Sequence, residues 1–165
     1  MNPLVRFVAR YHRWLPLGLF LLVASVAALI GSIATAAGLA TWYPALRKPA
    51  WTPPAWIFAP VWTALYILMS VAAWRVWRQA APREARRTFA WFAAQLSLNA
   101  LWSVLFFGLQ RPGAALVEGI VLWLLLVAML NRFWRTDRVA GMLWVPYVAW
   151  VGFAMLLNAA LWRLN

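Results

Sequence analysis

Residues 15–39 read LPLGLFLLVASVAALIGSIATAAGL and contain no charged side chain. A helix rises about 1.5 Å per residue, so a run of this length crosses the roughly 30 Å hydrocarbon core of a bilayer. Its apolar residues are continuous, without the alternation of a membrane β-barrel strand. The stretch therefore predicts a transmembrane α-helix. Because the run exceeds the roughly 7–15 apolar residues of a cleaved signal peptide, we expect it to be retained.

Four further apolar runs follow, at about residues 57–77, 89–109, 114–130 and 139–161, each close to the length that a transmembrane helix needs. The composition agrees, since 66% of the chain is hydrophobic and 11% is charged, against about 45–50% and about 25% in soluble domains. The sequence predicts an all-α membrane protein, a bundle of five transmembrane helices within residues 15–165, preceded by a basic extension at residues 1–14.

The longest connection, residues 40–56, is rich in proline and tryptophan. Pro44, Pro49, Pro53 and Pro54 each lack a backbone N–H and restrict the residue before them. We therefore expect a loop without regular helix over the whole of 40–56.

The basic residues predict the orientation of the bundle. Eleven fall on the side of the N-terminus and of the second and fourth connections, and four fall on the other side. The positive-inside rule then places the N-terminus inside and the C-terminus outside, with the loop at 40–56 outside. A net charge of +12 would suggest nucleic acid in a soluble protein, but here the arginines lie between apolar runs, so we expect no nucleic-acid partner.

Several kinds of chemistry are excluded by the residue types. The chain has no cysteine, which excludes disulfides, thiolate nucleophiles and cysteine-ligated metals. The single histidine, His12, lies among Arg6, Arg10 and Arg13 and reads as a solvated interfacial residue, so no metal site is predicted. The apolar runs hold no carboxylate pair or histidine dyad for acid–base or nucleophilic catalysis.

Nine of the fourteen tryptophans fall into two groups, the second of which also holds a tyrosine and an asparagine. One group lies near the inner helix ends beside arginines, where amphipathic rings form an aromatic belt at the membrane interface. Its members are Trp14, Trp74, Trp77, Trp91, Trp134 and Trp144.

The second group projects to one layer in the outer half of the membrane, about 8–16 Å from the outer helix ends. It comprises Trp62, Tyr66, Asn99, Trp102 and Trp150. Spacings of three and four residues place these side chains on common helix faces. Aromatic stripes of this kind either pack helices together or line a ligand pocket, and spacing alone leaves both interpretations open.

Polar residues inside the apolar runs favour a site in the bundle interior, because amides and acids avoid hydrocarbon and seek partners. These are Gln95, Asn99, Asn158 and Glu118. Glu118 is the only acidic residue within a predicted span. It serves either as a structural hydrogen-bonding group or as a proton site.

Three stretches carry a resemblance to a known family. Residues 42–66 read WYPALRKPAWTPPAWIFAPVWTALY, residues 98–108 read LNALWSVLFFG, and residues 146–158 read PYVAWVGFAMLLN. In this order and spacing they closely resemble the tryptophan-rich sensory protein and translocator protein family, also called the peripheral benzodiazepine receptor family. The resemblance covers about residues 31–163 and leaves out the basic extension.

The resemblance implies a five-helix protein that binds porphyrins and other tetrapyrroles in a pocket covered by the first loop. Protoporphyrin IX or a related tetrapyrrole is the expected ligand, and no resident cofactor is expected. The predicted ligand-binding residues are Trp51, Phe58, Trp62, Tyr66, Asn99, Trp102, Trp150, Ala154 and Asn158. In some bacterial relatives, tryptophans matching Trp62 and Trp150 are associated with light-dependent breakdown of protoporphyrin, which would make these two residues catalytic.

One departure concerns cholesterol. The animal members place a tyrosine just after the Leu-Asn of the fifth helix, whereas Ala159 follows Leu157-Asn158 here. Cholesterol is therefore a poor candidate ligand.

Three functions remain open on the sequence: a tetrapyrrole-binding sensory or transport protein, a light- and oxygen-dependent porphyrin-degrading enzyme, and a small proton-coupled exporter using Glu118. We expect a multi-pass protein of the bacterial cell membrane. We also expect a homodimer through the third helix, because Ala90-x-x-x-Ala94 and Ala93-x-x-x-Ser97 permit close backbone approach.

Overall fold

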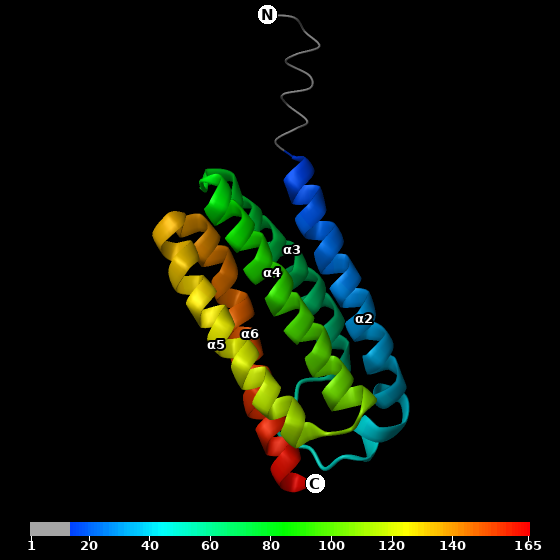
Figure 1. Cartoon of the computed structure of the whole chain (residues 1–165). Helices are drawn as coiled ribbons and strands as arrows, with labels where there is room; N and C mark the ends of the chain where they lie inside the picture. The colour runs from blue at the N-terminus through cyan, green and yellow to red at the C-terminus, as the bar shows by residue number, and fades with distance from the viewer. Residues whose placement is uncertain (1–13) are drawn as a thin grey trace, which may run out of the picture.

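The structure is a computed structural model that describes residues 14–165, apart from the side chain at position 37. It consists of five long helices (Figure 1). They are α2 (Leu15–Ala45), α3 (Phe58–Gln79), α4 (Pro82–Ser103), α5 (Pro112–Thr136) and α6 (Arg138–Leu164). A 3-10 turn, η1 (Ala55–Ile57), leads into α3, and a π-helical segment, η2 (Val104–Gly108), continues α4. Each of the five is long and apolar enough to cross a membrane, which confirms the predicted fold class. The predictions for His12 and its neighbouring arginines lie outside the described residues.

The helices form two groups that share α3 and α4 as their centre. In Figure 1, α2 lies along α3 and α4, while α5 and α6 pair with each other and close the opposite side. The α3–α4 and α5–α6 turns meet at the end where α2 begins, which we call the arginine-rich end. Its described basic residues are Arg75, Arg78, Arg83, Arg86, Arg87, Arg132, Arg135 and Arg138. That this end faces the inside of the cell stays a prediction.

The other end holds the chain between α2 and α3, the connection from η2 to α5, and the end of α6 (Figure 1). We call it the pocket end. Residues 46–54 cross it outside any long helix, and we call them the covering segment. A separate small core lies here, built on Phe106, Ala115, Leu157 and Leu161.

Local sequence signals explain where the helices start. Pro82 and Pro112 are the first residues of α4 and α5, where the missing N–H costs no hydrogen bond and the fixed φ suits a helix. Asp137 caps α6, because its Oδ1 accepts from the backbone N–H groups of Val139 at 2.9 Å and Ala140 at 3.3 Å.

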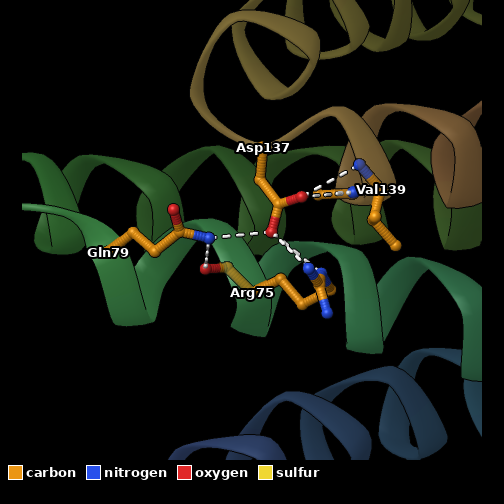
Figure 2. A network of polar contacts seen from close by, with 5 residues as sticks. Arg75, Gln79, Asp137 and Val139 are labelled. Atoms are coloured by element: carbon orange, nitrogen blue, oxygen red, sulfur yellow. Dashed lines mark hydrogen bonds and ion pairs between the residues drawn. The ribbon is translucent and has the colours of Figure 1, made fainter.

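The same aspartate ties the α5–α6 turn to α3 (Figure 2). Its Oδ2 accepts 2.8 Å hydrogen bonds from Arg75 Nε and from Gln79 Nε2, and Arg75 Nη2 also lies 2.8 Å away. Partial burial acts to raise the pKa of Asp137. This effect of burial is outweighed by the hydrogen bonds from the Ala140 and Val139 N–H groups and by the hydrogen bond and charge of Arg75. The pKa of Asp137 therefore lies below its ordinary value.

The predicted loop at 40–56 is wrong for its first six residues, because α2 continues to Ala45. Pro44 lies next to the end of this helix, so its missing N–H removes one hydrogen bond where the ladder is already ending. Lys48 closes the turn, since its Nζ donates to the carbonyl oxygens of Pro44 at 3.1 Å and Leu46 at 3.2 Å. The loop is thereby shorter, and α2 reaches the level of the pocket.

The helices also extend beyond the predicted spans at the arginine-rich end. Helix α5 ends at Thr136, whereas its predicted span ended at residue 130. Helix α4 begins at Pro82, whereas its predicted span began at residue 89. Hydropathy identifies only the part of a helix that lies in the hydrocarbon core of the membrane. Arginines in the end turns can lay their stems along apolar surface with the guanidinium in water, so a helix continues past that limit.

The aromatic-belt interpretation is wrong for two tryptophans. Trp144 is completely buried and Trp74 nearly so. Trp144 Nε1 donates to the carbonyl oxygen of Leu126 at 3.1 Å, and its ring packs edge-on against Phe133 at 4.8 Å. Trp74 stacks on Trp14 at 4.9 Å with Arg78 over its ring. Proximity to arginines in sequence did not reveal which way these rings point.

Candidate functional site

An aromatic pocket lies at the pocket end, between α2, η1, α3, the α4–η2 junction and α6. Its volume is about 130 Å³ and its walls are mostly apolar. The lining residues are Thr35, Leu39, Tyr43, Ala55, Phe58, Trp62, Trp102, Phe107, Trp150 and Ala154. Six of these ten carry an aromatic ring, and they come from segments far apart in the chain. The site therefore exists only in the assembled bundle.

One wall is a row of rings that reaches the covering segment. Phe58 meets Trp150 edge-on at 5.9 Å, Trp150 meets Phe153 at 5.7 Å, and Phe153 meets Trp51 at 5.8 Å. Trp51 belongs to the covering segment and is 50% exposed. It rests on the rim of the pocket through Phe153 and does not line the cavity.

The facing wall is formed where α4 changes into the π-helix. Trp102 stacks on Phe106 with centroids 4.9 Å apart and an interplanar angle of 14°, and it meets Phe107 edge-on at 6.0 Å. Helix α2 packs against this wall through Gly38, where a Cβ would lie 2.5 Å from the Phe107 carbonyl oxygen. Any larger residue at this position would push α2 away, so Gly38 sets the distance between α2 and the wall formed by Trp102, Phe106 and Phe107.

Beneath the pocket lies a buried chain of hydrogen bonds. The Tyr66 hydroxyl donates to Asn99 Oδ1 at 2.8 Å, Asn99 Nδ2 donates to the Tyr147 hydroxyl at 3.2 Å, and that hydroxyl donates to Gln95 Oε1 at 2.8 Å. Trp62 covers the chain, with its ring 5.7 Å from Tyr66 and 6.2 Å from Tyr147. Helices α3, α4 and α6 are thus joined by polar groups directly under an apolar cavity.

The structure brings together most of the residues predicted for the site. Five of them line the cavity, namely Phe58, Trp62, Trp102, Trp150 and Ala154. Tyr66 and Asn99 form the layer beneath, and Trp51 lies at the rim. Asn158 lies elsewhere, because its Nδ2 donates to the Pro112 carbonyl oxygen at 2.7 Å and joins α6 to the start of α5. The assignment of all these side chains to a ligand stays a prediction.

Sequence reasoning missed the α2 wall of the pocket, Ala55 and Phe107 in the rest of its lining, and part of the hydrogen-bond chain. Thr35, Leu39 and Tyr43 follow one face of α2 at i, i+4 and i+8. The expected loop began at residue 40, which cut this stripe in two. Tyr147 lies three residues before Trp150 and so nearly on the same face of α6, and that spacing was the available signal for it.

Glu118 lies on α5 with both carboxylate oxygens buried and without a hydrogen-bond partner among residues 14–165. Trp102 Nε1 is likewise buried and unpartnered within the described chain. The two come from adjoining helices, since a Cβ on the neighbouring Gly119 would lie 3.2 Å from Trp102 Cδ1 and would overlap Met155 Sδ. Within residues 14–165 no group of three or more acidic or histidine side chains is placed to hold a metal ion.

Two cations lie in the covering segment, and they differ in availability. Lys48 is engaged by two carbonyl oxygens and lies over the Tyr43 ring at 4.9 Å. Arg47 makes its hydrogen bonds to Asn165 through its backbone, which leaves its guanidinium without a hydrogen-bond partner in the described residues. Arg47 is therefore the cation of the covering segment whose guanidinium is not engaged by the described residues.

Comparison with known proteins gives one consistent family. The TspO/MBR family model matches residues 19–163. The chain is 44% identical over 125 residues to "Protein CrtK" of Rhodobacter capsulatus, covering 75% of this chain and 78% of that protein. It is 44% identical over 124 residues to the "Tryptophan-rich sensory protein" of Cereibacter sphaeroides, covering 75% and 77% of the two chains.

A similarity to animal proteins extends over more of the chain. The chain is 34% identical over 154 residues to the "Translocator protein" of Bos taurus, and the match covers 92% of this chain and 91% of that protein. The residues matched by the family model, 19–163, include the covering segment, the rings of the pocket and the hydrogen-bond chain beneath it. With this coverage and the five-helix membrane fold, the chain belongs to the TspO/MBR family.

Proposed function

We propose that the protein binds a tetrapyrrole in the aromatic pocket and acts as a sensory or transport protein of the bacterial cell membrane. The observation that carries this is the set of six rings around one cavity. A flat, apolar macrocycle can stack on or meet edge-on the faces of indole, phenol and phenyl rings, and such ring pairs add about 0.5–1.5 kcal/mol beyond area burial. The similarity to bacterial proteins, one of them named "Tryptophan-rich sensory protein", supports the sensory role and the location.

The size of the cavity says how binding must proceed. At about 130 Å³ it is smaller than ordinary small-molecule sites, which run to about 300–1,000 Å³. A macrocycle therefore needs the walls of the cavity to move apart, and outward movement of the covering segment at the rim would open the way in. The contacts that oppose this movement are Trp51 against Phe153, the hydrogen bonds between Arg47 and Asn165, and those of Lys48 with the end of α2. The free guanidinium of Arg47 would then meet a propionate of the bound ligand.

Titration of the purified protein with protoporphyrin IX, followed by quenching of tryptophan fluorescence, tests this proposal. Ala154→Leu adds three carbons to the cavity wall and should weaken binding at least tenfold. Ala149→Leu is the matched control, because Ala149 is exposed on the same helix and lies outside the pocket lining. Equal affinities for the two variants would argue against this pocket as the site.

A second candidate is light- and oxygen-dependent breakdown of the porphyrin. It is favoured by the position of Trp62, which lines the cavity and contacts both Tyr66 and Tyr147. An excited porphyrin could take an electron from such an indole, and dioxygen would supply the oxygen of the product. Illumination of the complex in air, with product masses compared with a dark sample, separates degradation from simple binding.

Proton-coupled export is a third candidate, and its supporting observation is Glu118. An acid buried in a membrane helix without a partner is a common proton site. Reconstituted liposomes carrying a pH gradient test it, because porphyrin movement should follow the gradient with the native chain and lose that dependence in Glu118→Gln. Movement that ignores the gradient in both would exclude export driven by Glu118.

A further inference from the structure

A second hollow lies at the arginine-rich end, far from the aromatic pocket. It is an open groove of about 400 Å³ between the end of α3, the α3–α4 turn, the first turn of α4 and the last turns of α5. Small side chains create the space, and arginines border it. The lining residues are Val76, Ala80, Ala81, Glu84, Ala128, Asn131, Arg132, Arg135 and Thr136. We call it the basic groove.

The charges in the basic groove do not cancel. Its one acid, Glu84, is already bound by Arg132 Nη2. Arg135 has neither an ion pair nor a hydrogen bond within residues 14–165. Arg132 Nε is buried and likewise lacks a partner in this part of the chain. The groove therefore keeps one uncompensated positive charge, on the exposed Arg135, whose guanidinium offers unused N–H donors of the kind that bind phosphate.

Arg132 is also held in place before any anion arrives. Its guanidinium lies 5.8 Å from the centroid of the Trp91 ring, and Arg87 lies over the same ring at 5.0 Å. Together with the Glu84 ion pair, this ring fixes the direction of the Arg132 side chain. An anion that enters the groove therefore meets an ordered donor, which lowers the entropic cost of binding.

An exposed apolar stripe on α5 continues from the groove toward the middle of the membrane. Ala128 and Asn131 line the groove, and one turn away from each lie the exposed Leu124 and Val127. The stripe goes on through Val121, Ile120 and Val117, all exposed. A molecule with an anionic head and long apolar tails fits this surface, with its head among the arginines and its tails along the stripe.

We infer that the basic groove binds the phosphodiester headgroup of an anionic glycerophospholipid. The groove lies at one end of the membrane-spanning helices, which is where headgroups are found. Basic pockets between transmembrane helices suit anionic lipids, and each arginine near the membrane surface contributes about 1 kcal/mol. This site is independent of the tetrapyrrole site, since it lies at the opposite end of the bundle.

Native mass spectrometry of the full chain in detergent, mixed with phosphatidylglycerol or with phosphatidylcholine of the same acyl chains, tests the inference. Phosphatidylglycerol should be retained preferentially. Arg135→Gln should weaken that retention about fivefold, the equivalent of one lost arginine. Arg83→Gln is the matched control, because it removes the same charge from an exposed residue at the same end that does not line the groove.

Ala128→Trp separates shape from charge. Ala128 is exposed, so a large side chain there fills the groove without disturbing the core or the net charge. This variant should lose the phosphatidylglycerol preference while keeping the helicity and unfolding temperature of the native chain. Equal retention of both lipids, an equal loss in Arg83→Gln, or full displacement of the lipid by millimolar inorganic phosphate would each overturn the inference.

Discussion

Asn165 holds the backbone of Arg47 through both the oxygen and the nitrogen of its side-chain amide. Its Oδ1 accepts from the Arg47 backbone N–H at 2.9 Å, and its Nδ2 donates to the Arg47 carbonyl oxygen at 3.1 Å. The same Nδ2 donates to the Leu161 carbonyl oxygen at 2.8 Å. The covering segment is therefore fastened to the end of α6, across the pocket end of the bundle.

Asn165→Ala should loosen the covering segment and let ligand exchange faster. Exposed hydrogen bonds of this kind contribute about 1 kcal/mol, so porphyrin dissociation should accelerate up to about fivefold. Stopped-flow quenching of tryptophan fluorescence measures this rate. Asn131→Ala, at the opposite end of the bundle, should leave it unchanged, and identical rates in both variants would mean that the segment does not gate the pocket.

Trp62→Phe and Trp150→Phe should separate binding from photochemistry. Phenylalanine keeps much of the stacking area, so affinity for protoporphyrin should fall by about 1 kcal/mol. Its ring is far harder to oxidise than indole, so light-dependent product should disappear. Product mass and binding titration are measured on the same samples, with Trp56→Phe as control because Trp56 is 74% exposed. Undiminished product in both variants would remove these tryptophans from the chemistry.

Tyr147→Phe should lower the free energy of unfolding of the bundle, although phenylalanine keeps the packing of the ring. It removes the hydroxyl between Asn99 and Gln95 and leaves both buried amides with an unmet hydrogen bond, at a cost of about 1–3 kcal/mol. Thermal unfolding in detergent measures the change. In Tyr43→Phe the lost hydroxyl has no hydrogen bond within the described residues, so the unfolding temperature should barely move. Similar temperatures for the two variants would contradict the role of the buried chain.

Asp137→Asn should remove a pH-dependent part of the stability. Folding lowers the pKa of Asp137, so the unfolded state binds the proton more readily, and the ion pair with Arg75 stabilises the fold above the ordinary pKa of about 3.9. This contribution is lost as pH falls through the lower, folded pKa. Asparagine still caps α6, so the variant should lose about 1 kcal/mol at neutral pH and match the native chain in acid. A difference that persists in acid would point to packing instead of charge.

Dimerisation through α4 is the remaining prediction. Ala90, Ala94 and Ser97 are exposed along one face of that helix, and Ala93 is partly covered. If two copies meet there, Ala94→Trp should convert cross-linked dimer to monomer in mild detergent, because small residues are what permit the close approach. Val121→Trp, on the exposed face of α5, should leave the dimer intact. Native protein that cross-links only as monomer would exclude the arrangement.

Hydropathy and length were enough to find the five helices, since each is a local sum over about twenty residues. The boundaries were harder, because Pro44 marks a helix end that hydropathy placed at residue 39, and arginines extend α4 and α5 past their apolar runs. Helical spacing and three recognisable stretches of sequence pointed to Phe58, Trp62, Trp102 and Trp150, and they missed Tyr43 and Phe107. Helical spacing and sequence motifs are both local properties of the chain, so they can be recognised without knowledge of tertiary contacts.

The sequence by itself determined that the chain is a five-helix membrane protein, and it pointed to four of the six rings that line the pocket. Only the tertiary structure decided that Trp74 and Trp144 are buried, that Asn158 bonds Pro112, and that Tyr147 joins Asn99 to Gln95. In a soluble helix the apolar stripe reveals the inner face. Here the helices are apolar all round, and lipid is as apolar as the protein core, so the inner face of each helix is set by packing against its neighbours.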